Sequence, residues 1–136
     1  MTVIEAIEKI KGKFLEYGNP AQIPLQIGRY FNAKMTPRGI KVDNLGNQSL
    51  LPWEVFQEAV CVLLRNGGRA SRGNAMNFRL GEKGLSVNSI EGHIAFTVYG
   101  KRNGDFVFRR IAPISAILVW ARICKTVPGE LILREP

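Results

Sequence analysis

Few side chains in this chain have the types and spacing that catalysis needs. His93 is the only histidine among the 136 residues, and acid–base or nucleophilic chemistry would require a carboxylate or a thiol beside it. Glu91 is close in sequence, but residues two positions apart lie on different faces of a helix. The pattern around His93 therefore does not indicate an active site.

Metal chemistry is not indicated either. The two cysteines, Cys61 and Cys124, lack CxxC spacing and lie in separate apolar runs, which is typical of buried free thiols in a reducing compartment. The sequence alone leaves a disulfide between them open. A metal-dependent nuclease needs two or three converging acids, and the spacing of Asp43, Glu54 and Glu58 gives no support for such a site. We therefore predict a protein that is not an enzyme and needs no metal and no cofactor.

The chemistry that the sequence does favour is the binding of an anion. The formal net charge is +8, and much of the positive charge lies between Gly67 and Arg110. That stretch holds eight of the 19 Lys and Arg residues against three acids. The eight are Arg69, Arg72, Arg79, Lys83, Lys101, Arg102, Arg109 and Arg110. Clustered positive charge attracts polyanions because binding releases counterions. Nucleic acid is thus the first expected partner, followed by an anionic membrane surface and an acidic protein.

A glycine-rich loop begins this stretch. Residues Gly67–Gly73 read GGRASRG, and their backbone N–H groups and two guanidinium groups could cradle a phosphate. The loop lacks the GK[ST] ending of a P-loop, so it does not indicate a kinase or a nucleotidase. The alternative interpretation is a solvated connection.

Aromatic residues interleave with the basic ones further along. They are Phe96, Tyr99, Phe106 and Phe108. Interleaved aromatic and basic side chains can stack on single-stranded bases, although aromatics in such a pattern more often belong to the core.

Apolar periodicity predicts the helices that position these residues. The expected helices cover residues 2–17, 52–66, 74–80, about 86–95 and 112–124. The first begins with a capping box formed by Thr2 and Glu5. Its regular apolar stripe must be covered either by the core or by another subunit.

Strand signals are clearest near the basic residues. Asn103-Gly104 between alternating apolar flanks predicts a hairpin turn, with strands at Phe96–Lys101 and Asp105–Ile111. Residues 94–99 fit both a helix and a strand, so their state stays open. A short strand or tail is expected at residues 131–134.

These elements predict an α+β fold with a helical core, a basic β-hairpin and an N-terminal amphipathic helix. We expect one domain over residues 1–136, in which helix 2–17 and an irregular segment 19–51 pack on a core of residues 52–136. Prolines break the 19–51 segment. A small sheet is the alternative there, since residues 39–45 look like a strand.

The order of helices followed by a basic hairpin resembles the winged helix-turn-helix plan in outline. In that plan the third helix enters the major groove, and the hairpin would lie against the backbone. The resemblance implies that the helix starting near residue 86 reads base edges while basic residues hold phosphates. The base-edge candidates are Ser86, Asn88, Ser89 and His93, and the other nucleic-acid-binding candidates are Arg69, Arg72, Arg79, Lys101, Arg102, Arg109 and Arg110. The alternative is an α+β domain whose hairpin only completes a sheet.

The hypothesis from the sequence is a non-catalytic DNA-binding protein. We expect it to be cytoplasmic and not to enter a membrane, because no signal peptide is visible and the longest apolar run, residues 111–123, falls short of the roughly 20 residues that span a bilayer. The alternative is a protein-interaction module or a homodimeric structural protein joined through helix 2–17. An enzyme acting on nucleic acid or nucleotides is a third, minor hypothesis.

Overall fold

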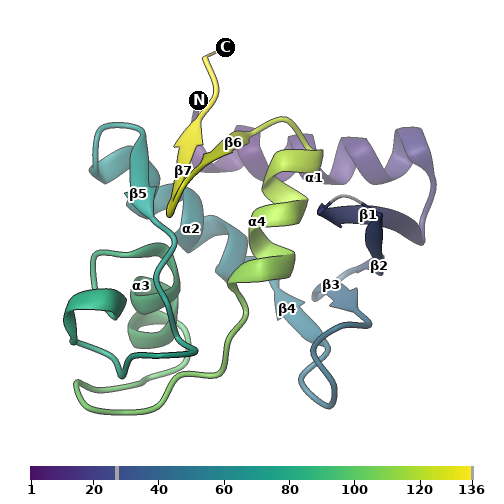
Figure 1. Cartoon of the computed structure of the whole chain (residues 1–136). Coiled ribbons are helices and arrows are strands. Elements are labelled where there is room, and N and C mark those ends of the chain that lie inside the picture. The colour runs from purple at the N-terminus through teal and green to yellow at the C-terminus, as the bar shows by residue number, and fades with distance from the viewer. Residues whose placement is uncertain (27, 136) are drawn as a thin grey trace.

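The computed structural model describes residues 1–26 and 28–135, over which the chain forms four α-helices and two antiparallel sheets (Figure 1). The helices are α1 (Val3–Tyr17), α2 (Trp53–Arg65), α3 (Ile90–Thr97) and α4 (Ile111–Trp120), with a 3-10 turn at Lys83–Leu85. The strands are β1 (Ala21–Gln26), β2 (Arg29–Thr36), β3 (Gly39–Val42), β4 (Leu50–Pro52), β5 (Arg69–Ser71), β6 (Cys124–Val127) and β7 (Glu130–Leu133). The expected α+β class is confirmed.

The first sheet contains β1 to β4 in chain order, each antiparallel to the next. It occupies the segment expected to be irregular, so that prediction is wrong and the small-sheet alternative is confirmed. Pro24 is compatible with this sheet because β1 is an edge strand, where a residue without an N–H is tolerated. The strand expected at residues 39–45 is β3, which ends at Val42.

Helix α1 packs along the core and carries the predicted capping box. The Thr2 hydroxyl accepts the Glu5 amide at 3.0 Å, and the Glu5 carboxylate accepts the Thr2 amide at 3.3 Å. The apolar stripe of α1 is buried in the main core, where Phe14 meets the ring of Trp120 with centroids 4.9 Å apart. Because the chain itself covers the stripe, α1 does not need a second subunit to bury it.

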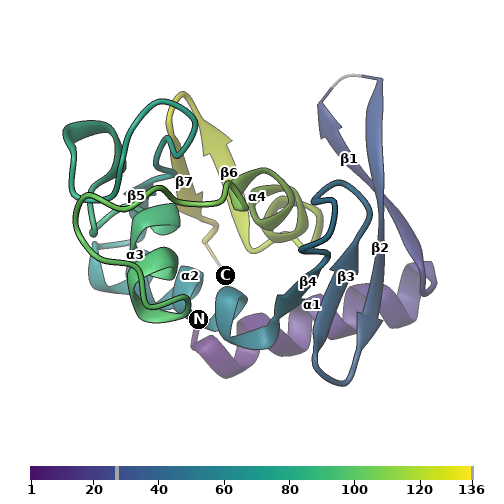
Figure 2. The same cartoon turned by 90° about the horizontal axis from the view of Figure 1, so that it is seen from below.

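Helices α2 and α4 hold the two sheets together. The predicted helix at residues 52–66 is confirmed as α2, which contacts α1, α3 and strands of both sheets. Helix α4 lies between the sheets and contacts β1 and β6 (Figure 2). It ends at Trp120, earlier than predicted, because the chain reverses at Arg122, where φ is 60°, and Cys124 begins β6. The predicted terminal strand is confirmed as β7, the central strand of the second sheet.

Helix α3 begins later and ends later than predicted. The Ser89 hydroxyl, and not Ser86 or Asn88, caps it by accepting the Gly92 amide at 3.1 Å. The helix continues to Thr97, so the extended strand predicted from Phe96 is wrong. The chain is helical there because Ile90 and Ile94, which are four positions apart, are buried on a helix that packs against α2.

The hairpin and wing predicted around Asn103-Gly104 are also wrong. The turn does form, but no strand flanks it among the described residues. Its backbone pairs with Leu80 instead, which donates to the Asp105 carbonyl at 3.0 Å and accepts the Gly104 amide at 2.8 Å. The chain from Lys101 to Arg110 is therefore irregular, and we call it the basic arm.

The short helix predicted at Asn74–Leu80 is replaced by a compact loop. The Asn74 side chain accepts the Asn77 amide at 3.2 Å, a local bond that competes with helix formation. The ring of Phe78 packs on Gly84, where a Cβ atom would lie 2.1 Å from it.

No helix among the described residues is long and apolar enough to cross a membrane.

The close approach of α3 to the chain before it gives a testable prediction. A Cβ on Gly92 would lie 2.0 Å from the Ser86 carbonyl oxygen, whereas a Cβ on Gly12 in α1 would meet nothing within 4 Å. Gly92→Ala should therefore lower the free energy of unfolding by about 1–3 kcal/mol. Gly12→Ala should raise it by about 0.5–1 kcal/mol through helix propensity. Urea unfolding measures both, and a Gly92→Ala variant as stable as the parent would contradict the packing described.

Candidate functional site

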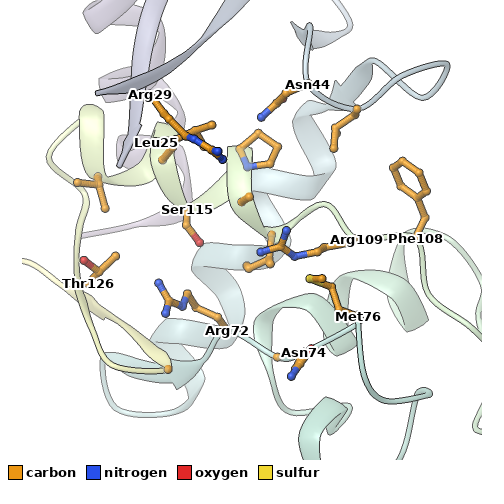
Figure 3. Close-up of a pocket in the computed structure, with 18 of the residues that line it drawn as sticks. Leu25, Arg29, Asn44, Arg72, Asn74, Met76, Phe108, Arg109, Ser115 and Thr126 are labelled. Atoms are coloured by element: carbon orange, nitrogen blue, oxygen red, sulfur yellow. The ribbon is translucent and has the colours of Figure 1, made fainter. Parts of the chain in front are cut away.

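A wide, open groove with a volume of about 1300 Å³ runs over one side of α4 (Figure 3). One wall comes from the first sheet and the loop after β3, including Asn44 and Gln48. The opposite wall comes from the chain after β5 and from the end of the basic arm. Segments distant in sequence thus meet around one helix.

The charged side chains that line the groove are Arg29, Arg72 and Arg109. No Asp, Glu or Lys lies among its lining residues, and no carboxylate of the described chain forms an ion pair with these three arginines. In the view of Figure 3 they approach the groove from three different segments. Arginine forks bind phosphate and carboxylate groups with two parallel hydrogen bonds. The groove is therefore an anion-attracting surface.

The other polar residues that line the groove are neutral. They are Asn44, Asn47, Gln48, Ser71, Asn74, Asn77, Ser115 and Thr126. The hydroxyl of Ser115, in α4, is buried and has no hydrogen-bond partner among the described residues. Buried hydroxyls are normally satisfied, so this oxygen is a place where a bound molecule could supply the missing partner.

The position of Arg109 depends on a buried carboxylate in α3. Glu91 accepts the backbone amides of Arg110 and Ile111 with one oxygen, at 2.9 and 2.6 Å. These amides lie at the start of α4, where the helix dipole favours negative charge. Glu91 therefore fixes the end of the basic arm and the first turn of α4. Burial raises the pKa of Glu91 to about 7, against the opposing effect of the two amides and of the nearby arginines.

Arg110 acts as a clamp inside the wall and does not face the groove. Its side chain is 5% exposed, and its guanidinium carbon lies 3.6 Å from the ring centroid of Tyr99 and 4.9 Å from that of Phe108. It donates to the side chain of Gln48 and to the Phe108 carbonyl. Burial lowers its pKa from the ordinary value. Arg110 was predicted to hold nucleic acid, but its side chain is buried and its two terminal nitrogens donate within the protein.

The structure brings only two of the predicted binding residues, Arg72 and Arg109, to the groove. Arg69 is paired with Glu130 on the second sheet. Arg79 lies over the ring of Phe106, 4.2 Å from its centroid. The remaining basic candidates, Lys101 and Arg102, lie at the turn of the basic arm and do not line the groove.

The predicted base-edge candidates serve the start of α3. Ser89 is its buried cap, and Ser86 accepts the Asn88 amide with its hydroxyl and the Ser89 hydroxyl with its carbonyl. Asn88 is exposed, and its backbone carbonyl accepts the side-chain amide of Asn66 at 3.3 Å. Ser86 and Ser89 thus build the start of α3, and none of the three residues lines the groove.

His93 does have a carboxylate partner, although not the one close to it in sequence. Its Nε2 lies 2.8 Å from Oε1 of Glu58 in α2, and its Nδ1 lies 3.5 Å from the Thr97 hydroxyl. Cys61 is on the same helix as Glu58, and burial and that carboxylate raise the pKa of its thiol, which keeps it protonated. No cluster of three potential metal-ligating side chains occurs among the described residues.

Arg29 is the groove residue that sequence reasoning missed. It begins β2, in the segment that was expected to be irregular, and no local pattern links it to Arg72 and Arg109, which lie 43 and 80 positions later. Comparisons with protein-family models, with curated proteins and with solved structures found no match for this chain.

The buried carboxylate predicts a pH-dependent stability. The pKa of Glu91 is about 7 in the folded protein against an ordinary 4.5, so the folded state favours the protonated form. Its contribution to stability is full below about pH 4.5 and is lost as the pH rises through about 7, by an amount on the order of 3 kcal/mol. Glu91→Gln keeps an oxygen for the two amides but does not titrate, so this loss should disappear.

Urea unfolding at about pH 5 and about pH 8 measures the effect, because other groups titrate equally in both proteins. Glu8→Gln, the same substitution at an exposed site on α1, is the matched control and should keep the parent's pH dependence. A Glu91→Gln variant with the parent's pH dependence would show that this carboxylate is not the titrating group.

Proposed function

We propose that this protein binds nucleic acid without catalysis, and that it holds the phosphate backbone in the groove beside α4. The observation that carries the proposal is the charge of the groove wall, which consists of Arg29, Arg72 and Arg109 with no acid among the lining residues. Positive groups that converge on a concave surface raise the local concentration of anions and release counterions when a polyanion binds.

The size of the groove favours an extended polyanion over a single small anion. Its volume of about 1300 Å³ exceeds the usual range for small-ligand sites, about 300–1,000 Å³. The three arginines come from the first sheet, the chain after β5 and the basic arm. Charges on separate walls suit a ligand that carries several phosphates along its length. The net charge of +8 supports the same class of partner.

The neutral groups between the arginines suit a nucleotide strand. Amide side chains can donate and accept at the same time, as base edges and sugars require. The unpaired Ser115 hydroxyl and the amides of Asn44 and Asn74 lie among the lining residues. The expected contact with nucleic acid therefore lies in the groove, which the C-terminal end of the basic arm helps to line, and not at the turn of that arm.

Replacing single arginines tests the proposal. Arg72→Gln and Arg109→Gln should each weaken binding to DNA by roughly tenfold and reduce the slope of log affinity against log salt by about 1, because each removes one phosphate contact. Arg38→Gln is the matched control, since Arg38 is exposed and does not line the groove but carries the same charge.

Fluorescence anisotropy of a labelled DNA, titrated at about 50 and 200 mM salt, provides the measurement. Absence of binding at the lower salt concentration would refute the proposal, as would binding without salt dependence. Equal losses in all three variants would mean that net charge, and not the groove, attracts the DNA.

A further inference from the structure

Two phenylalanines of the basic arm are exposed: Phe108, which lines the groove, and Phe106, two residues before it in the same arm. The exposed fraction is 72% for Phe106 and 38% for Phe108, while Val107 between them is buried. Met76 on the facing loop is 70% exposed, and Met76 and Phe108 both line the groove. Burying a phenylalanine side chain is worth about 1.5–3 kcal/mol. Exposed apolar side chains gathered beside an arginine-lined groove mark a contact surface.

Each of these rings is held from one side by an arginine. The guanidinium carbon of Arg79 lies 4.2 Å from the ring centroid of Phe106, and that of Arg110 lies 4.9 Å from the centroid of Phe108. Arg110 is itself fixed by Tyr99 and Gln48. The rings are therefore held in place, and the exposed area of Phe106 leaves its other side open. A fixed aromatic ring with an open face is a stacking platform.

The backbone of the arm offers donors beside the rings. None of the four amides from Phe106 to Arg109 donates to an acceptor among the described residues. Backbone N–H groups must find partners in water or in a ligand. Phosphate oxygens accept from such groups and from arginine. In Figure 3 Arg109 extends toward the groove while Phe108 stands at its rim, so charged and aromatic contacts lie one residue apart.

The structure disfavours recognition of intact duplex through α3. Most of that helix is buried, namely Ile90, Glu91, Gly92, Ile94 and Ala95, and its first turn is tied to the start of α4 by Glu91. Direct readout of duplex DNA usually needs an exposed helix or ribbon that enters the major groove. Bases in a duplex are also stacked on each other, so their faces reach a protein ring only when they are unpaired or flipped out.

We infer that the preferred ligand is an unpaired nucleic-acid strand, with its phosphates on Arg72 and Arg109 and its bases stacked on Phe106 and Phe108. This inference rests on the proposed function, because it names the strand that the same groove takes. Stacking is tolerant of sequence since every base has a flat face. The difference in affinity between single strand and duplex should therefore be larger than the difference in affinity between base sequences.

The test compares a labelled oligothymidylate of about 12 nucleotides with a duplex of the same length. The full chain should bind the single strand more tightly than the duplex. Phe106→Leu and Phe108→Leu should each weaken single-strand binding by roughly fivefold to tenfold, because leucine keeps the apolar volume but has no flat ring. The salt dependence should stay as in the parent, since no charge is removed. In contrast, Arg109→Gln should reduce the salt dependence of binding, because it removes a positive charge.

Two controls separate stacking from other effects. Phe96→Leu removes an exposed ring that lies in α3, outside both the basic arm and the groove lining, and it should bind like the parent. Heparin carries negative charge without bases, so its binding should not respond to the phenylalanine substitutions. Phe106 is so exposed that its replacement should leave thermal unfolding unchanged, which keeps the test valid if Phe108→Leu affects folding.

The outcomes distinguish this inference from the proposed function. Equal affinity for single strand and duplex, with both leucine variants binding like the parent while Arg109→Gln still weakens binding, would overturn the inference and leave the proposed function in place. No binding of either DNA at low salt would remove the proposed function and the inference with it.

Discussion

The arrangement of the groove depends on one buried carboxylate. Glu91 sits in the first turn of α3 and accepts the two amides that open α4, so a single side chain ties two helices and the end of the basic arm together. The two amide hydrogen bonds and the positive end of a helix offset only part of the cost of burying this carboxylate, because its pKa is still raised to about 7. Without this contact, no other hydrogen bond to a described residue would hold the Arg110 amide.

Arg110 extends this connection to the first sheet. It stacks on Tyr99 and reaches Gln48 in the loop after β3, so the two walls of the groove are joined beneath the surface. The adjacent arginines differ in exposure because they have different roles. Arg110 builds the wall, and Arg109 faces the groove. The buried Nε of Arg110 has no hydrogen-bond partner among the described residues. The stacked rings and the hydrogen bonds of the other two nitrogens must outweigh this cost.

Local signals in the sequence predicted local structure well. The capping box of Thr2 and Glu5 and the regular apolar face of α2 required no knowledge of the rest of the chain. The hairpin prediction failed because the turn at Asn103-Gly104 pairs with Leu80, a tertiary choice that no neighbouring residue reveals. The groove was predictable only in part for the same reason. Arg72 and Arg109 lie in a visibly basic stretch, whereas Arg29 comes from another sheet.

The order of strands in the second sheet bears on how the chain acquires this surface. Strand β7 lies between β5 and β6, so β5 has no hydrogen-bonded neighbour until residues 130–133 have been synthesised. Chains emerge from the ribosome N-terminus first. The first sheet and α1 can therefore assemble before β5, the strand that leads into Arg72, finds its partner in residues 130–133. The wall of the groove that the first sheet provides can thus form before the opposite wall, and Arg29 can be in place before Arg72 has a paired strand to extend from.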